Sequence, residues 1–313
     1  MNFKEIHVPV LLKEVLYYLN LKKGDVVFDG TLGGAGHTVE IIKAIAPTGK
    51  VIGVDLHSQT LSTASTLLEK FSENVVLVND NFANIIKILK GLNTKAIDGM
   101  LLDLGLSSFL IERSGRGFSY LRDEELDMRF GNGGLRAFDV INDYTEDELT
   151  GIFKRYGEER WAKLIAGNIT RSRKAGDIKT TGELAEIIKS SIPEKYRYKR
   201  KGNPAKRIFQ ATRIEVNKEL DNLKTAIKDG FKMLKSKGRM VIISYHSLED
   251  RLVKRSFLEF EGICTCPPEL PVCTCGREKT AEIITRKAVK PCWEEIDLNP
   301  RSRSARLRAL EKL

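Results

Sequence analysis

Between residues 26 and 103 the sequence alternates short apolar runs, rich in β-branched residues, with amphipathic stretches. This rhythm constrains the fold more than any other feature of the chain. Strands are expected at Val26 to Asp29, Val51 to Asp55, Val75 to Asn79 and Met100 to Asp103, with helices at Thr38 to Ala44, Gln59 to Phe71 and Ala83 to Leu89. Strands joined by crossover helices run parallel, because each helix returns the chain to the same edge of the sheet. The sequence therefore predicts an α/β fold with a parallel sheet.

The rhythm stops after about Ser108 and resumes a hundred residues later. The intervening sequence is polar, and its apolar spacing favours helices at Glu146 to Tyr156, Glu159 to Arg171 and Thr181 to Ser191. The α/β pattern then continues with a helix at Asn217 to Leu234, a turn at Gly238 and strands at Met240 to Tyr245, Glu282 to Val289 and Ser304 to Leu310. We therefore expect a core made of residues 1–112 and 216–313, interrupted by an inserted, mainly helical domain at 113–215.

The charge balance favours a polyanionic partner. The 313 residues carry a formal net charge of +10, and a basic protein attracts nucleic acid over long distances. The alternative is that this charge serves only solubility. The sequence has neither an apolar leader at its start nor a run of 18 apolar residues, so we expect a cytoplasmic protein without a membrane partner.

The first expected strand runs into a glycine-rich turn, Asp29-Gly30-Thr31-Leu32-Gly33-Gly34-Ala35-Gly36-His37. Glycines at a strand-to-helix turn let a ligand approach the backbone, because no Cβ stands in the way. The candidate cofactor-binding residues here are Gly34, Ala35, Gly36 and His37. The spacing differs from G-x-G-x-x-G, which favours a nucleoside cofactor over a dinucleotide such as NAD.

The candidate cofactor site also includes two residues at the ends of the second and third expected strands. Asp55 ends the second strand, where a carboxylate can accept hydrogen bonds from both hydroxyls of a ribose. The alternative is that Asp55 caps the following helix. Phe82 follows the third strand and can stack on a base, although an aromatic residue at a helix start is also a common core residue.

The candidate catalytic residues follow the fourth and fifth strands. Asp103, Ser107 and Ser108 place a carboxylate and two hydroxyls at the carboxyl edge of the sheet, where they can accept hydrogen bonds from an amine. His246, next to Tyr245, is a candidate base or substrate contact. The alternatives are that Asp103 contacts only the cofactor, that the serines cap a helix, and that His246 belongs to a helix start.

A basic segment lies at the end of the expected insertion. From Lys195 to Arg213 there are eight basic residues and no acidic one, interleaved with Tyr196, Tyr198 and Phe209. Basic and aromatic side chains together suit RNA, because they neutralise phosphates and stack on exposed bases. The alternative is a solvated basic face. The candidate substrate-binding residues are Lys199, Arg200, Lys201, Lys206, Arg207 and Arg213.

All five cysteines lie between positions 264 and 292. Cys264, Cys266, Cys273 and Cys275 offer four thiolates within a short loop, which is the number that a structural zinc ion takes. Reduced cysteines without a metal are the alternative, since paired C-x-C spacings are less typical of zinc sites than C-x-x-C.

In addition, the sequence resembles the ribosomal RNA small subunit methyltransferase H family almost from end to end. The matching segments, in order, are His7 to Leu11, Asp29 to His37, Leu101 to Gly105, Arg116 to Ser119, Leu126 to Arg129, Tyr156 to Arg160, Phe209 to Ala211, Arg213, Ser244 to Arg251 and Asn299 to Arg301. The chain departs from the family at Phe109 and Leu110, where members commonly have Pro-Gln.

This resemblance implies a Rossmann-like core that binds S-adenosyl-L-methionine, with cofactor contacts from Ala35, Gly36, His37, Asp55, Phe82 and Asp103. It further implies methylation of the exocyclic N4 of a decoding-centre cytidine in 16S rRNA of the small ribosomal subunit. The target base must be unpaired or flipped into the pocket to reach the methyl donor. Two other functions remain open: an NAD-dependent oxidoreductase, which the glycine spacing disfavours, and a non-catalytic ribosome-assembly factor.

Overall fold

The computed structural model describes residues 9–106, 114–197, 203–263, 276 and 278–313. The chain divides into two compact units, which are described separately below. The first contains Met1–Gly105 and Leu220–Leu313, and the second contains Leu106–Glu219. The helical insertion expected at 113–215 lies inside the second unit.

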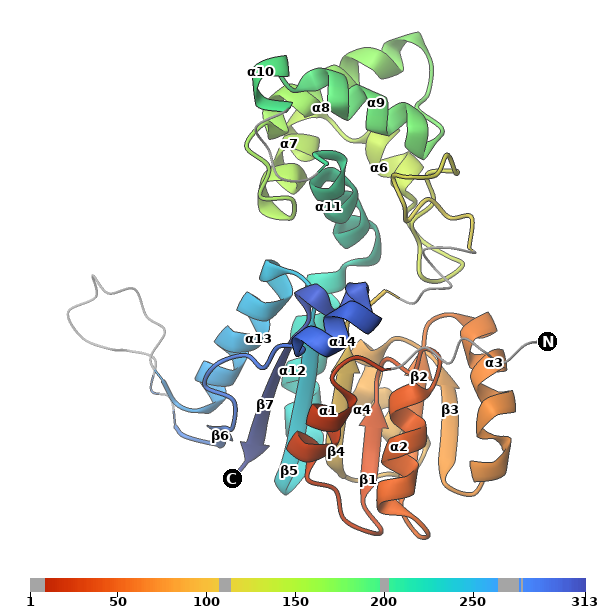
Figure 1. Ribbon diagram of the computed structural model, residues 1–313, viewed down its shortest axis with the longest axis vertical. Coiled ribbons are helices and arrows are strands. Elements are labelled where there is room, and N and C mark those ends of the chain that lie inside the picture. The colour runs from red at the N-terminus through yellow and green to blue at the C-terminus, as the bar shows by residue number, and fades with distance from the viewer. Residues whose placement is uncertain (1–8, 107–113, 198–202, 264–275, 277) are drawn as a thin grey trace. The chain divides into compact units, whose positions relative to one another are not determined.

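The first unit is built on a seven-stranded sheet in the order β3-β2-β1-β4-β5-β7-β6 (Figure 1). Strands β1 to β5 are parallel, whereas β7 is antiparallel to both β5 and β6. The strands are β1 (Val26–Asp29), β2 (Lys50–Asp55), β3 (Val75–Asn79), β4 (Ile97–Asp103), β5 (Leu234–Ser244), β6 (Ala281–Ile283) and β7 (Arg306–Lys312). The predicted α/β, Rossmann-like fold is confirmed.

Helices cover both faces of this sheet, which explains why its central strands are apolar throughout. Neighbouring strand residues alternate between the two cores: Val27 packs into one and Phe28 into the other. One core contains α1 (Leu12–Leu19), α2 (Gly36–Ile45) and α3 (Ser58–Leu68), and α1 and α2 lie in front of the sheet in Figure 1. The other contains α4 (Ile85–Gly91), α12 (Glu219–Met233) and α13 (Ser247–Phe260). The remaining elements of this unit are η1 (Glu69–Phe71), η2 (Phe82–Asn84), α14 (Trp293–Leu298) and η4 (Pro300–Ser304).

The closing strands differ from the prediction. Strand β6 ends at Ile283, and Val289 makes only an isolated bridge with Leu307. The reason is local, because the hydroxyl of Thr285 accepts the backbone N–H of Ala309 at 2.8 Å, in the place of a backbone acceptor. Gly238 lies within the bounds of β5, but the register against β4 shifts between Leu234 and Arg239. Lys237 adopts a positive φ of 66°, so the strand bends sharply beside Gly238, where the turn was expected.

The second unit is helical. Its elements are α6 (Ala137–Asp143), α7 (Glu146–Arg155), α8 (Ala162–Ser172), η3 (Arg173–Ala175), α9 (Thr181–Ser191), α10 (Glu194–Arg197) and α11 (Ala205–Asn217). They enclose a core of their own around residues such as Phe153, Ile165 and Ile208. Helix α8 begins three residues later than expected because Glu159 accepts the backbone N–H of Trp161 at 2.9 Å and holds the preceding turn outside the helix.

Gly157 fixes the approach of α11 to the turn between α7 and α8. A Cβ at this position would lie 2.7 Å from the carbonyl oxygen of Phe153 and 2.9 Å from that of Arg207. Backbone atoms cannot move aside as a flexible side chain can. We expect Gly157→Ala to lower the free energy of unfolding of the helical unit by about 1–3 kcal/mol, the usual cost of overpacking. Urea unfolding of the full chain measures it, and Gly151→Ala, at an open helical position, is the control. Equal stabilities of the two variants would contradict this assignment.

No helix in the described part of the chain combines the length and the apolar character that a bilayer crossing requires.

Candidate functional site

Three aspartates end neighbouring strands at one edge of the sheet. Asp29 ends β1, Asp55 ends β2 and Asp103 ends β4. The chain order reverses at β1, because β2 follows on one side of it and β4 lies on the other. Open parallel sheets bind ligands outside the carboxyl ends of the strands at such a reversal. The edge formed by these aspartates is therefore the candidate site.

The glycine-rich turn leads from β1 into α2 at this edge. Gly33 and Ala35 adopt positive φ angles of 50° and 61°, which bend the turn sharply before the helix begins. Gly36 packs against Pro9, where an added Cβ would lie only 2.5 Å from the proline Cγ. At Gly34 an added Cβ would meet no described atom within 4 Å. The turn is thus tightly packed on one side and open to a ligand at Gly34.

The Asp55 carboxylate is held by two backbone groups. Its Oδ2 accepts the N–H of Gly33 at 2.9 Å and its Oδ1 accepts the N–H of His57 at 2.8 Å. Burial raises the pKa of this carboxyl above its usual range, although both hydrogen bonds oppose the rise. Each oxygen keeps a second lone pair, so the fixed carboxylate can still accept two hydroxyl groups. The helix cap itself is His57, whose side chain accepts the N–H of Thr60.

His37 and Asp29 are buried side chains at the two ends of the glycine-rich turn. The Nε2 of His37 lies 3.0 Å from the carbonyl oxygen of Val10, and because a carbonyl only accepts, Nε2 carries the proton. The Nδ1 of the same ring lies 3.9 Å from Oδ2 of Asp103. Asp29 is fully buried and accepts the hydroxyl of Thr38 at 2.6 Å, and burial raises its carboxyl pKa. His37 therefore presents one ring nitrogen toward the carboxylate of β4.

Asp103 is oriented from both neighbouring strands. Its backbone N–H donates to the hydroxyl of Thr31 at 2.6 Å, and its Oδ1 accepts the N–H of Gly105 at 3.2 Å. The phenol of Tyr245, one residue beyond β5, lies close enough to this carboxylate to feel its charge. Burial and then the charge of Asp103 raise the pKa of Tyr245 far above its usual range, so the phenol stays protonated and is a donor near Asp103. The carboxylate is fixed in place with acceptor capacity remaining.

Thr31 was not among the predicted site residues, and Tyr245 was noted only as the neighbour of His246. The signal for Tyr245 is its position one residue beyond β5, because β4 and β5 are paired and their ends meet at one edge. Thr31 gave no comparable signal, since its contact is to a backbone group 72 residues away.

Phe82 begins η2 and is partly buried against the second core. A Cβ at Gly30 would lie 2.9 Å from the Cβ of Phe82 and 2.5 Å from a methyl of Leu102. Phe82 is thus packed against the turn that follows β1. Its proposed contact with a base stays a prediction.

His246 caps α13. Its Nδ1 accepts the backbone N–H of Glu249 at 3.4 Å, while Glu249 accepts the backbone N–H groups of Tyr245 and His246. The Nε2 of His246 lies 3.1 Å from Oε1 of Glu249, without the geometry of a hydrogen bond. The alternative that His246 belongs to a helix start is confirmed, and both ring nitrogens of His246 face the first turn of α13.

The candidate substrate-binding residues within the described chain lie on α11. Lys206 and Arg207 are exposed in its first turn. Arg213 instead makes a two-bonded ion pair with Glu219, at 2.7 and 2.9 Å. Other predicted residues lie outside the described residues: Ser107, Ser108, Lys199, Arg200, Lys201, Cys264, Cys266, Cys273 and Cys275. The structural zinc ion therefore stays a prediction, which metal analysis of the purified protein measures.

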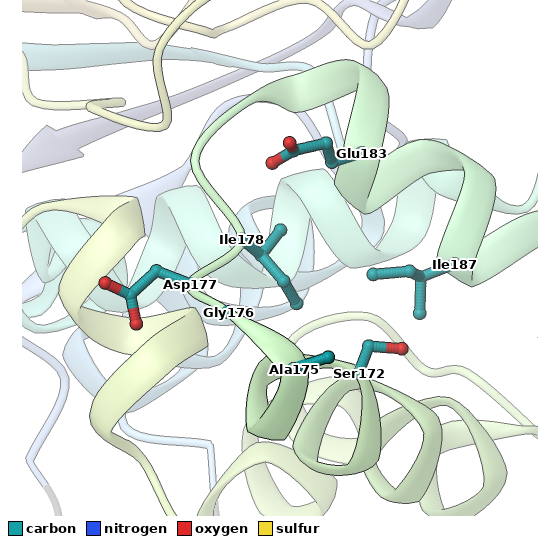
Figure 2. Close-up of a pocket in the computed structure, with 7 residues that line it drawn as sticks. All are labelled: Ser172, Ala175, Gly176, Asp177, Ile178, Glu183 and Ile187. Carbon is teal, nitrogen blue, oxygen red and sulfur yellow. The ribbon is translucent and has the colours of Figure 1, made fainter.

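A pocket of about 390 Å³ opens in the helical unit between η3 and α9 (Figure 2). It is lined by Ser172, Ala175, Gly176, Asp177, Ile178, Glu183 and Ile187. None of the predicted site residues is among them. The carboxylate of Glu183 accepts the backbone N–H groups of Lys179 and Thr180, so it serves the start of α9.

Comparison with known proteins gives a consistent result along the whole chain. A family model described as the MraW methylase family matches residues 4–313. A ribosomal RNA small subunit methyltransferase H from Clostridium botulinum is 48% identical over 314 residues, covering 100% of both chains. One from Halothermothrix orenii is 50% identical over 308 residues, covering 98% of each. Among solved structures, an rRNA methylase from Streptococcus thermophilus gives a TM-score of 0.42 at 13% identity, over 97% of this chain and 92% of that one.

Proposed function

Because the chain belongs to the MraW methylase family, we propose that it transfers a methyl group from S-adenosyl-L-methionine to N4 of a decoding-centre cytidine in 16S rRNA. The observation that carries the proposal is 48–50% identity, from end to end, to proteins named as small subunit rRNA methyltransferases. The choice of atom and base rests on the sequence resemblance. The substrate would be the small ribosomal subunit, which implies a cytoplasmic protein.

The residues at the carboxyl edge fit the proposed cofactor. Asp55 would accept both ribose hydroxyls with the lone pairs that Gly33 and His57 leave free. The open side of Gly34, with Ala35, Gly36 and His37, would lie along the rest of the molecule. Phe82 would border the base. When bound, S-adenosylmethionine supplies a methyl group made electrophilic by its attachment to a sulfonium.

Asp103 would act on the amine of the substrate. The lone pair of an exocyclic amine is delocalised into the ring, and a carboxylate that accepts one of its protons localises that lone pair. Asp103 suits this role because the N–H of Gly105 holds one carboxylate oxygen without using all of its acceptor positions, and the protonated phenol of Tyr245 lies nearby. Transfer forms the N–C bond, breaks the S–C bond and releases one amine proton, which Asp103 would accept or pass to water. Holding the amine in line with the methyl group would supply much of the rate enhancement.

The other predicted catalytic residues would support this arrangement. His246 would act mainly through the start of α13, where Glu249 also holds the backbone of Tyr245. Ser107 and Ser108 follow Asp103 in sequence and are proposed as further acceptors for the amine. The helical unit would bind the RNA, with Lys206 and Arg207 as exposed cations and Lys199, Arg200 and Lys201 beside them in sequence.

The assignment of Asp55 gives a measurable prediction. Asp55→Ala should weaken binding of S-adenosylmethionine by about 1–3 kcal/mol, because the ribose hydroxyls and two backbone N–H groups lose their acceptor. Titration calorimetry measures the affinity, and Asp98→Ala, near the opposite end of β4, is the control. Asp98 accepts the backbone N–H of Val26 and pairs with Lys235, away from the carboxyl edge. An unchanged affinity in Asp55→Ala would remove the ribose assignment.

The proposed function is tested by incubating the protein with unmethylated small subunits and labelled S-adenosylmethionine, followed by nucleoside analysis. We expect label in N4-methylated cytidine. Binding to the subunits without transfer would favour the non-catalytic assembly factor. Binding of NAD in calorimetry, with no binding of S-adenosylmethionine, would favour the oxidoreductase.

A further inference from the structure

Within the helical unit, the turn between α7 and α8 packs against the first two turns of α11. The Nη1 of Arg207 donates to the carbonyl oxygen of Glu158 at 3.2 Å, and the amide of Gln210 donates to that of Tyr156 at 3.2 Å. At Gly157 the two backbones are in close contact, because an added Cβ would lie 2.9 Å from the carbonyl oxygen of Arg207. The turn and the start of α11 therefore meet in one contact surface.

A buried carboxylate lies beneath this surface. The side chain of Glu159 is 0% exposed, whereas that of Arg207 is 51% exposed. The Oε1 of Glu159 accepts the backbone N–H of Trp161, and its Oε2 lies 3.9 Å from Nη1 of Arg207. The guanidinium is thus anchored on its inner side by a charge and a carbonyl. Because a guanidinium has five donors, several remain for a ligand on the outer side.

Two further arginines near this turn are held against aromatic rings. Arg155 lies over Tyr156 with 4.6 Å to the ring centroid, and Arg160 lies over Trp161 with 5.3 Å. Both arginines are exposed. Stacking restricts the guanidinium plane, so less entropy is lost when a phosphate binds. Lys206 adds a fourth exposed cation, while Glu158 is the exposed acid of this segment.

We propose, on the basis of the proposed function, that Arg155, Arg160, Lys206 and Arg207 form an RNA phosphate-binding surface and that Glu159 is the residue that positions Arg207. RNA is the partner that this chemistry fits. A guanidinium can donate two hydrogen bonds to one phosphate, and its flat face can stack on an exposed base. A structural role for Glu159 includes accepting the N–H of Trp161. Glutamine supplies such an acceptor, whereas only the carboxylate attracts Arg207.

The test measures binding of the full-length protein to purified small ribosomal subunits over a range of salt concentrations. Arg207→Gln should weaken binding about three- to tenfold. It should also make the fall of log K with log salt less steep by about 0.7–0.9, the value for one lost phosphate contact. Arg155→Gln combined with Arg160→Gln should lower the slope by about twice as much. The control is Arg136→Gln, an exposed arginine of the same unit that stacks on Phe138 and pairs with Asp139. It should leave the slope unchanged.

Glu159→Gln separates positioning from folding. We expect weaker subunit binding with an unchanged melting temperature, and we expect this effect to disappear in the Arg207→Gln background, because coupled residues are not additive. Equal losses in both backgrounds, or a slope in Arg207→Gln equal to that of Arg136→Gln, would overturn the proposal. Failure of the wild-type protein to methylate the subunits would instead refute the proposed function, since the binding slopes are measured without the methyl donor.

Discussion

Asp103→Asn is expected to lower kcat for methyl transfer by about 10²- to 10³-fold, within the range of a lost general acid–base contribution. The amide keeps the size of the side chain and can still accept from Tyr245, but its NH₂ group repels the amine protons of the substrate. Single-turnover label transfer at saturating S-adenosylmethionine and subunits measures the rate. Calorimetry and a melting curve establish that the variant binds the cofactor and folds.

The matched control is Asp98→Asn on the same strand. Asp98 lies near the opposite end of β4, where it accepts the backbone N–H of Val26 and pairs with Lys235. Since it is remote from the carboxyl edge, kcat should be unaffected. Tyr245→Phe, which removes the protonated phenol near Asp103, should lower kcat by about tenfold. A full wild-type rate in Asp103→Asn would refute the role of this carboxylate.

Arg308→Met is expected to destabilise the α/β unit by about 3 kcal/mol, because removal of one partner leaves a buried charge less compensated. The Nε of Arg308 donates to Asp250 at 2.7 Å, and both side chains are about one-tenth exposed. This pair joins α13 to β7. Urea unfolding at neutral pH measures the change. Arg303→Met, on exposed η4, is the control that should stay near wild type.

The same ion pair predicts a pH dependence. Burial opposes ionisation of Asp250, but the hydrogen bonds from Arg308 and Arg306 outweigh it and hold the carboxyl pKa below its usual range. In the unfolded chain the carboxyl of Asp250 therefore has a higher pKa, near the usual aspartate value of about 3.9. The contribution is fully present above that value and is lost as the pH falls through the folded pKa. Asp250→Asn should remove this part of the acid dependence, and an unchanged slope of stability against pH below about 4 would contradict the assignment.

The strands of the core were predictable because each is a short apolar run that ends at a polar residue. The bounds of β1 and β3 agree with the expectation, and β2 begins one residue earlier. Burial on both sheet faces makes such runs apolar throughout. In contrast, α11 was not predicted, and α12 begins at Glu219 instead of Asn217. The helical pattern continues across this boundary, and the break depends on Lys218, which adopts a positive φ of 49°.

The candidate site was predictable where a residue follows a strand and unpredictable where its partner is distant in sequence. Asp55 and Asp103 were identified from strand ends alone, and the structure brings both to one edge. The contact between Asp103 and Tyr245 depends on the pairing of β4 with β5, which the sequence order alone did not specify. Likewise, Arg213 was assigned to RNA from the basic composition of its segment, but in the structure it pairs with Glu219.

The central claim is that one site at the carboxyl ends of β1, β2 and β4 holds the methyl donor beside the acceptor carboxylate. A crystal structure of the protein soaked with S-adenosylmethionine tests it most directly. We expect ribose density within hydrogen-bond distance of Asp55 and the methyl carbon on the side of Asp103. Density for the donor anywhere else, with this edge of the sheet vacant, would contradict the account.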